Sequence, residues 1–197
     1  MRWLAVVLLT LALSLPTGLG SVALPVAASS CSHYDSRTTP PKTIRVFRAH
    51  HRGSTVKARV ELWNFKKYVG SVMASGAWPN RPRESAKVGA IAIKQYAWWM
   101  ILNHQPGHSW HGQCYDITDS EQYLKDVHVP VRTASAVSVT WGVSLRKGGR
   151  FFRTGWSGGL QYDHWHLGED ATRKAAQWGW GWRRIIHTFL SPVEIRA

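Results

Sequence analysis

Segment 83–103 carries the strongest helical pattern in the chain and constrains the fold more than any other feature. Its sequence, which includes ESAKVGAIAIKQYAWWMIL, is apolar nearly all round, and small residues such as Gly89 and Ala90 let neighbouring elements pack closely against it. A helix without a polar face is buried. We therefore expect a central buried helix that organises the core, with Lys94 and Gln95 as a polar pair that reaches out to solvent or lines a cleft.

Shorter elements flank this helix on both sides. Alternating apolar and polar residues predict paired strands at 43–49 and 55–63, and Asn64 is the predicted cap of a helix over 65–74 that ends at Gly76. Further along, the pattern predicts a short strand at 115–118, a helical turn at 120–124, a helix at 131–140 and a hairpin of 143–146 with 150–154 around a Gly-Gly pair. A glycine-rich bend at 155–159 and two amphipathic helices at 168–177 and 181–190 follow. This mixture predicts a single α+β domain with small antiparallel strands and C-terminal helices.

The N-terminus has the pattern of a secretory signal peptide. Arg2 supplies a positive charge, residues 3–16 (WLAVVLLTLALSLP) form an apolar run too short for a membrane anchor, and small residues predict cleavage after Ala28. The chain then divides into a signal peptide, an extended polar leader and one folded domain, at 1–28, 29–42 and 43–197. We therefore expect a secreted, extracytoplasmic protein that does not span a membrane.

A strong positive charge constrains the partner. The chain holds 25 Lys and Arg against 11 Asp and Glu, a formal net charge of +14 at pH 7, and Arg2 of the signal peptide accounts for one of these charges. Outside a cell such a surface meets anionic wall polymers, lipid headgroups or stray nucleic acid, and charge alone does not choose among them. Export argues against a nucleic-acid-binding module.

Two cysteines and a group of histidines leave two interpretations open. In an oxidising compartment Cys31 and Cys114 predict a disulfide that ties the leader to the domain. Alternatively, His104, His108, His111 and Cys114 lie within eleven residues and would be zinc ligands, although an intervening Pro-Gly pair favours a loop over helical ligand spacing. Both interpretations need Cys114, and we expect the disulfide and no cofactor. A lipid anchor on Cys31 is a weaker alternative, because the residues before it lack a large apolar side chain.

Several linked motifs resemble one family of bacterial cell-wall proteins. The runs YVGSVMASGAWP, ESAKVGAIAIKQYAWW, CYDITDSEQYL and ASAVSVTWGVSLRKGGRFFRTGWSGG agree in order and spacing with the stage II sporulation protein D family, also called the LytB amidase-enhancer family. The run GWGWRRIIHTFLSP matches the closing helix of that family, so the resemblance covers 43–197. It implies a lytic transglycosylase fold that acts on the glycan strands of peptidoglycan, with a cell-wall amidase as a further candidate partner.

The chain departs from the family pattern at the catalytic acid. The resemblance implies a Glu directly before the Trp of a Glu-Trp-Pro element, and this chain has Ala77 there, or Gly76 in the alternative register. No Asp or Glu occurs in 62–83, so no shift of register supplies the carboxyl group that donates a proton to the glycosidic oxygen. We therefore expect a protein that binds glycan without cutting it. An active enzyme with Glu84 or Asp116 as a relocated acid is the alternative, although Glu84 is also favoured at the start of a helix.

The resemblance also implies a sugar-binding groove on the matching segments. Sugars are bound by aromatic faces and by polar groups in a concave site. The expected groove residues are Trp78, Gln95, Tyr96, Asp116, Gln122, Tyr123, Trp156, Ser157, Gly158 and Gly159. Trp98, Trp99 and Trp141 are predicted to be core residues, whereas Trp178, Trp180 and Trp182 form either an exposed sugar-binding shelf or the packing of the last helix.

Overall fold

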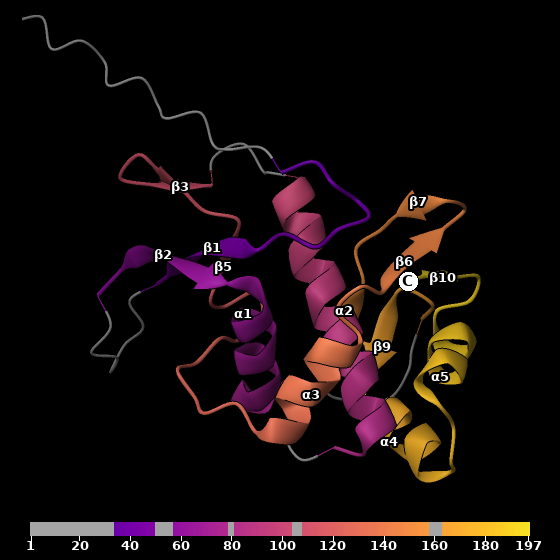
Figure 1. Cartoon of the computed structure of the whole chain (residues 1–197). Coiled ribbons are helices and arrows are strands. Elements are labelled where there is room, and N and C mark those ends of the chain that lie inside the picture. Colours follow the sequence, from indigo (N-terminus) through magenta and orange to yellow (C-terminus); the bar gives the residue numbers. More distant parts are fainter. Residues whose placement is uncertain (1–33, 50–56, 79–80, 104–107, 158–162) are drawn as a thin grey trace, which may run out of the picture.

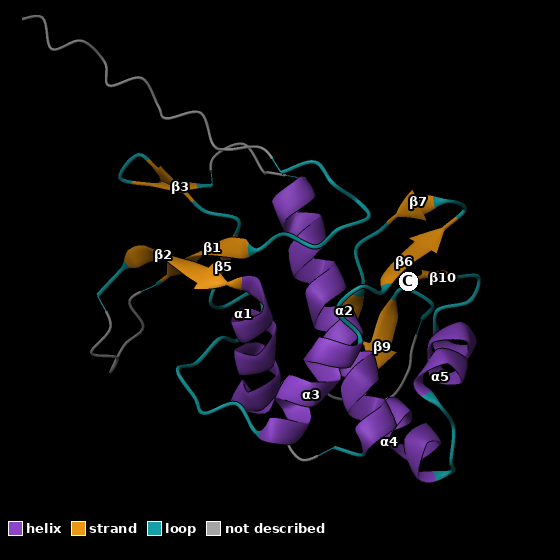
Figure 2. Cartoon of the chain, in the orientation of Figure 1, coloured by secondary structure: helices purple, strands orange, loops and turns teal. Residues whose placement is uncertain are grey.

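Helix α2 (Arg83–Leu102) runs through the middle of the molecule, as the sequence predicts (Figure 1). The structure, a computed structural model, describes residues 34–49, 57–78, 81–103, 108–157 and 163–197. Side chains of α2 enter two hydrophobic clusters, one containing Ile93 and Trp98 and the other containing Val88 and Ile91. Both clusters therefore depend on this helix, which lies between the two halves of a single α+β domain (Figure 2).

The first half consists of a small sheet and helices that pack on one side of α2. Its elements are β1 (Thr43–Arg48), β2 (Arg59–Asn64), α1 (Phe65–Val72), the π-helix η1 (Met73–Ala77), β5 (Ile117–Thr118) and α3 (Val131–Val139). Strand β1 is central, antiparallel to β2 and parallel to β5. The side chain of Asn64 accepts a hydrogen bond from the Lys67 N–H at 3.1 Å, which confirms the predicted cap of α1.

The second half surrounds the other hydrophobic cluster. Its elements are β6 (Ser144–Lys147), β7 (Arg150–Phe151), β8 (Gly155–Ser157), β9 (His166–Gly168), α4 (Glu169–Gln177), α5 (Trp182–Phe189) and β10 (Glu194–Arg196). Between β6 and β7, Gly148 and Gly149 have φ of 53° and 72°, a left-handed conformation that a tight hairpin turn requires. The predicted hairpin is therefore confirmed, and Ile185 and Ile186 of α5 are buried as predicted.

The strand pairing is more mixed than the sequence indicates. The β1–β5 and β8–β9 pairs are parallel, whereas β1–β2, β6–β7 and β6–β10 are antiparallel. Residues 155–157 are a strand rather than part of a bend, because β9, a short way further along the chain, supplies a hydrogen-bonding partner. A further short hairpin of β3 (Ser109–Trp110) and β4 (Gln113–Cys114) lies where no strand is predicted.

The leader packs against the C-terminal part of α2. The indole N–H of Trp98 donates to the carbonyl of Ser36 at 3.0 Å, and the Trp98 ring meets Phe151 edge-on with 4.8 Å between centroids. Trp98 is fully buried, which confirms its predicted core position, while Trp99 and Trp141 are half-buried against the same cluster. The described part of the leader, residues 34–42, therefore belongs to the folded surface.

The polar pair of α2 reaches neither solvent nor a cleft. Lys94 Nζ donates to the carbonyls of Thr140, Trp141 and Val143 at 2.6, 2.7 and 2.7 Å. Gln95 Nε2 donates to the carbonyls of Leu145 and Phe152 at 2.9 and 3.0 Å, and Gln95 Oε1 accepts from the Leu145 N–H at 3.1 Å. These side chains supply hydrogen bonds that the end of α3 and the start of β6 would otherwise lack. Gln95 is therefore a core residue, and its predicted place in the sugar groove is wrong.

Candidate functional site

Three of the predicted groove residues belong to the interior instead. Trp78, Gln95 and Gln122 are 1%, 0% and 1% exposed. The indole N–H of Trp78 donates to Ser85 Oγ at 3.2 Å. Gln122 accepts from the Tyr68 hydroxyl at 2.9 Å and donates to the carbonyl of Ile93 at 3.2 Å. These polar groups satisfy one another inside the core, so a sugar does not reach them.

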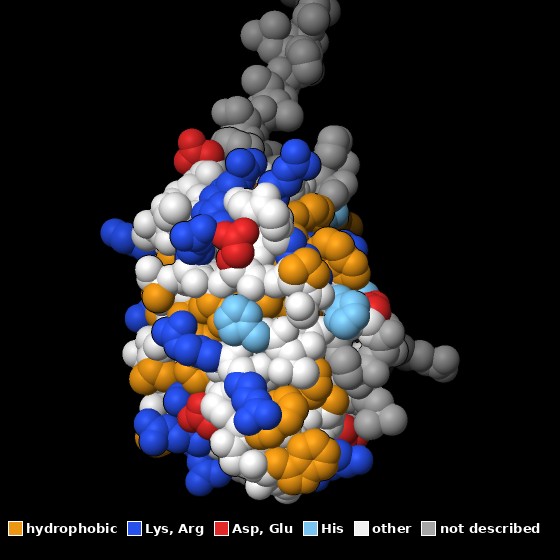
Figure 3. All heavy atoms as spheres, turned by 90° about the vertical axis from the view of Figure 1, so that its right-hand side faces the viewer, with side chains coloured by type: hydrophobic (Ala, Val, Ile, Leu, Met, Phe, Trp, Pro, Cys, Tyr) orange, Lys and Arg blue, Asp and Glu red, His pale blue; other side chains and the backbone are white. Residues whose placement is uncertain are grey.

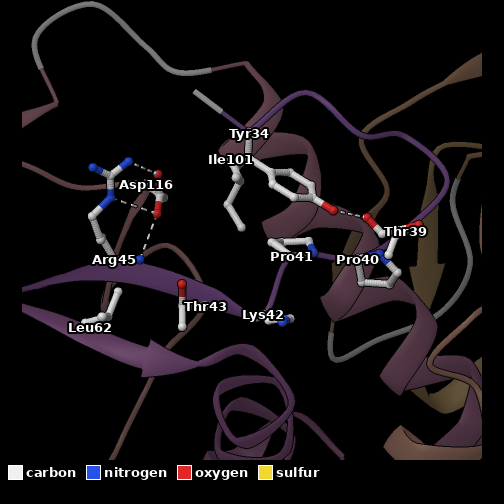
Figure 4. Close-up of a pocket in the computed structure, with 10 residues that line it drawn as sticks. All are labelled: Tyr34, Thr39, Pro40, Pro41, Lys42, Thr43, Arg45, Leu62, Ile101 and Asp116. Carbon is white, nitrogen blue, oxygen red and sulfur yellow. Dashed lines mark hydrogen bonds and ion pairs between the residues drawn. The ribbon is translucent and has the colours of Figure 1, made fainter. Parts of the chain in front are cut away.

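The carboxylate of Asp116 forms an ion pair with the guanidinium of Arg45. Its carboxylate accepts hydrogen bonds from the Arg45 backbone N–H at 2.7 Å and from Arg45 Nη2 at 3.0 Å (Figure 4). The pair lies on the wall of a cavity of about 550 Å³ between the leader and β1, and Figure 4 shows Tyr34, Pro40, Pro41, Leu62 and Ile101 around it. The Asp116 carboxylate is therefore engaged by Arg45 on the wall of this cavity, a geometry that does not favour the predicted role of Asp116 as a relocated acid.

Glu84 is likewise unsuited to general acid catalysis. Its carboxylate accepts from Lys87 Nζ at 2.6 Å and from the Trp182 N–H at 3.0 Å. Burial acts to raise the pKa of Glu84, but the hydrogen bonds from Lys87 and Trp182 outweigh it and lower that pKa below its usual value. A general acid needs the opposite shift. Glu84 therefore lies in the first turn of α2 and accepts the first N–H of α5, an arrangement that does not favour its predicted role as a relocated acid.

The position of the family's acid lies in the wide turn η1. Gly76 has φ of 140°, and the Trp78 N–H closes the turn on the Met73 carbonyl at 2.9 Å. Tyr123, a predicted groove residue that is 56% exposed, lies beside Gly76, since a Cβ on this glycine would be 3.8 Å from Tyr123 Cε1. Lys125 Nζ lies 4.6 Å from the Tyr123 ring centroid. The sequence of η1 contains no carboxylate, so this corner presents an aromatic ring and a cation instead.

Two predicted groove residues do meet in one pocket. Tyr96 of α2 and Trp156 of β8 line a cavity of about 330 Å³, which we call the Tyr96–Trp156 pocket; its lining residues are Tyr96, Glu121, Arg153, Gly155, Trp156 and His166. The Trp156 ring meets Trp78 edge-on at 5.7 Å, so the pocket lies one aromatic contact away from the residue that follows Ala77. The guanidinium of Arg153 lies 5.6 Å from the Tyr96 ring centroid.

The phenol of Tyr96 is a hydrogen-bond donor at neutral pH. Burial raises its pKa, the carboxylate of Glu121 raises that pKa further, and Arg153 opposes the shift. Glu121 Oε2 itself accepts from the Thr118 N–H at 2.6 Å. The pocket therefore combines two aromatic faces with a phenol, a carboxylate and a guanidinium.

His166 completes this pocket from the neighbouring strand β9 and is held there by Asp163. His166 Nδ1 lies 2.7 Å from Asp163 Oδ2, and Asp163 Oδ1 accepts from the N–H groups of Trp165 and His166 at 2.7 and 2.8 Å. Burial acts to raise the pKa of Asp163, but the hydrogen bonds from Trp165 and His166 together outweigh it and lower that pKa overall. The His166 ring covers Gly155 so closely that no Cβ fits there. The Asp163 carboxylate thus fixes the orientation of the imidazole at the rim.

Sequence reasoning missed four of these polar residues. Glu121, Arg153, Asp163 and His166 were not among the predicted site residues, although the first two stand inside the matching motifs. Their charges next to predicted aromatic residues were the available signal. Ser157 Oγ is buried and has no hydrogen-bond partner within the described part of the chain. Gly158 and Gly159 lie outside the described residues.

The cysteine and histidine segment provides no metal site within the described ranges. Cys114 is disulfide-bonded, which removes it as a thiolate ligand, and the other cysteine of the chain, Cys31, lies outside the described residues. His108 stacks on Tyr115 with 4.9 Å between ring centroids, and His111 meets Trp110 edge-on at 4.5 Å. Residues 34–49, 57–78, 81–103, 108–157 and 163–197 contain no group of three metal-ligating side chains. His104 is not among them.

Comparison with known proteins gives no family assignment. No family model, curated protein or solved structure matches this chain. Its functional interpretation therefore depends on the motif resemblance and on the geometry of the Tyr96–Trp156 pocket. Within the described ranges, no helix has the length and apolar character needed to cross a bilayer.

Proposed function

We propose that the chain is a secreted protein of the bacterial cell wall that binds peptidoglycan glycan strands and does not cut them. The observation that supports this most directly is the Tyr96–Trp156 pocket, because it joins two aromatic residues from motifs 60 positions apart that were predicted to bind sugar. Pyranose rings stack their C–H faces on aromatic side chains, while hydroxyl and amide groups pair with polar residues. Glu121, Arg153 and His166 supply such polar partners.

The proposed lack of catalysis depends on the missing general acid. Ala77 and Gly76 have no proton to donate, Glu84 has a lowered pKa, and Asp116 is paired with Arg45. Without a carboxyl group held in its protonated form at these positions, the glycosidic oxygen receives no proton from them as the bond breaks. The positive charge of the chain then has the secondary role of holding the protein near anionic wall polymers.

Trp156→Ala is expected to weaken binding to insoluble peptidoglycan about tenfold, because it removes one stacking face of the pocket. The measurement is a pull-down on peptidoglycan stripped of anionic polymers, repeated at high salt so that charge-driven adhesion is screened. Trp178→Ala is the matched control, since Trp178 is 72% exposed and does not line the pocket. Wild-type binding by Trp156→Ala, with its fold intact by circular dichroism, would show that the pocket is not the sugar site.

A second candidate function is favoured by one observation. Glu121 is the carboxylate among the six residues that line the pocket, and it faces the same space as Tyr96 and Trp156. An active lytic transglycosylase would use Glu121 as its acid. The binding function is better supported, because the Glu121 carboxylate accepts the Thr118 N–H at 2.6 Å and so is held as an acceptor that closes its own turn.

Incubation with denuded glycan strands separates the two candidates. We expect no anhydro-muropeptide products from the wild-type protein by mass spectrometry, and no change in Glu121→Gln. Products that form with the wild-type chain and disappear in Glu121→Gln would establish the enzyme and refute the proposal. Glu84→Gln serves as the matched carboxylate control, because Glu84 lies outside the pocket.

A further inference from the structure

The turn between α4 and α5 and the first turn of α5 carry a group of aromatic and cationic side chains, some exposed and some half-buried, which we call the Trp–Arg surface. Its residues are Trp178, Trp180, Trp182, Arg183 and Arg184. Trp178 is 72% exposed and touches Trp180 edge-on with 6.3 Å between centroids. Figure 1 places this turn at the lower end of the molecule, and Figure 3 shows hydrophobic side chains among Lys and Arg side chains on the face that carries α5.

The arginines of this surface are held over the indole rings. Arg183 Cζ lies 4.5 Å from the Trp182 ring centroid, and Arg184 Cζ lies 4.1 Å from that of Trp180. Neither arginine pairs with a carboxylate in the described part of the chain, whereas Arg173 of α4 is paired with Asp170 at 3.1 Å. The cationic heads and the aromatic faces therefore form one continuous patch, available to a partner.

The stretch of sequence that carries this patch contains no acidic residues. No Asp or Glu occurs between Asp170 and Glu194, a stretch that also contains the exposed Lys174 and His187. The partly exposed carboxylate of Glu84 approaches from α2, but its charge is paired with Lys87 and it accepts the Trp182 N–H. The patch consequently favours an anionic partner.

The inner side of α5 fixes this surface in place. Ile185, Ile186 and Leu190 are buried in the second hydrophobic cluster, and Phe189 packs on Trp180 with 6.5 Å between centroids. The core thus needs Trp180 as a packing residue, but it makes no use of most of the Trp178 ring. Trp178 therefore leaves a large aromatic surface in water, beside arginines that have no carboxylate partner in the described part of the chain. A matching partner would offer apolar groups to the indole and anionic groups to the arginines.

We propose that the Trp–Arg surface docks on a bilayer rich in anionic phospholipid, with the indoles at headgroup level. Tryptophan rings prefer this depth, and arginine binds lipid phosphates in bidentate fashion. A neutral glycan strand would use the rings but would leave the arginines without a counter-charge. None of these residues lines the Tyr96–Trp156 pocket, so this interaction does not depend on the sugar site.

The test is co-sedimentation with vesicles of phosphatidylcholine, with and without phosphatidylglycerol. The chain from Ser29 onward is used, because it contains all described elements and lacks the apolar N-terminal run. We expect binding only to the anionic vesicles and a loss of that binding with added salt. Trp178→Ser reduces the partition coefficient about tenfold, and Arg183→Gln with Arg184→Gln reduces it about 10- to 30-fold.

Matched controls separate the surface from total charge and hydrophobicity. Lys66→Gln with Lys67→Gln removes the same charge from the exposed side of α1, and Leu62→Ser removes an exposed apolar side chain from β2. Both are expected to bind vesicles within about twofold of wild type. An equal loss in these controls, or unchanged binding in Trp178→Ser, overturns the proposal.

The sugar site and the membrane surface are tested against each other. Trp156→Ala is expected to lose peptidoglycan and keep the anionic vesicles, while Trp178→Ser does the reverse. If Trp178→Ser loses stripped peptidoglycan and keeps vesicle binding, the patch is a sugar-binding shelf and the membrane proposal is wrong. If Trp156→Ala keeps peptidoglycan while Trp178→Ser loses vesicles, the proposed function fails and the membrane surface stands.

Discussion

Replacing Lys94 by Met is expected to lower the free energy of unfolding by about 3 kcal/mol near pH 9, because it leaves buried carbonyl groups without a donor. Lys94 Nζ lies 2.6 to 2.7 Å from the carbonyls of Thr140, Trp141 and Val143, and the neutral amine that prevails near pH 9 has two N–H groups to donate to them. The Thr140 carbonyl keeps the Val143 N–H at 3.1 Å, so the loss falls mainly on the other two. Urea denaturation followed by circular dichroism measures the change. Lys67→Met, on the exposed side of α1, is the control and should stay within about 0.5 kcal/mol of wild type.

The cost of Lys94→Met should also depend on pH. Burial, with a smaller contribution from the charge of Lys66, lowers the pKa of Lys94 from 10.5 to about 7. Between these two values the unfolded chain binds more protons than the folded one, so the free energy of unfolding of the wild type rises with pH, by at most about 1.4 kcal/mol per unit. The variant lacks this site. The difference between the two proteins therefore grows from pH 7 upward, and parallel curves for wild type and variant would contradict the assignment.

Gly89→Ala is expected to lower the free energy of unfolding by about 2 to 3 kcal/mol, despite the better helix propensity of alanine. A Cβ at Gly89 would lie 2.5 Å from Trp78 Cδ2 and 2.7 Å from Cγ. Trp78 is buried, its indole N–H is bonded to Ser85, and its ring meets Trp156, so it has no free direction in which to move. Thermal and urea unfolding measure the loss.

The control for this substitution is a glycine with open space around it. A Cβ at Gly142 meets no heavy atom within 4 Å, so Gly142→Ala should change stability by less than about 0.5 kcal/mol. In the Gly89→Ala background, Trp78→Leu should recover part of the loss, because the smaller side chain makes room for the new methyl group. Simple additivity of the two substitutions would show that the indole is not the cause.

Local patterns determined what could be predicted of the fold. Helix α2, the Asn64 cap and the turn at Gly148 and Gly149 depend on residues that are neighbours in sequence, and all were predicted. The parallel pairing of β1 with β5 joins Val46 to Ile117, which no local pattern indicates. Strand partners that lie far along the chain are fixed by the packing of the whole domain, and periodicity does not contain that information.

The candidate site was predicted in part for a similar reason. Tyr96 and Trp156 lie in the same pocket, as the motif resemblance implies, but Gln95 and Gln122 are buried. A glutamine in a family-like motif can donate to backbone carbonyls of the core as well as to a ligand. The position of the neighbouring strand decides which of these partners it has. Glu121 reaches the pocket from a turn, and His166 reaches it from strand β9. Neither placement follows from the local sequence pattern, so the sequence did not single these residues out.

Helix α2 supplies side chains to both hydrophobic clusters, and this has a consequence for how the molecule opens. If one half loosens, the helix on which the other half rests loses its packing as well. Amide hydrogens on both sides should therefore exchange through the same global opening and not through separate partial ones. Proteases cut chains that open locally, so a protein without a half-open form offers them few segments to cut. Such resistance would suit a molecule that is proposed to work outside the cell.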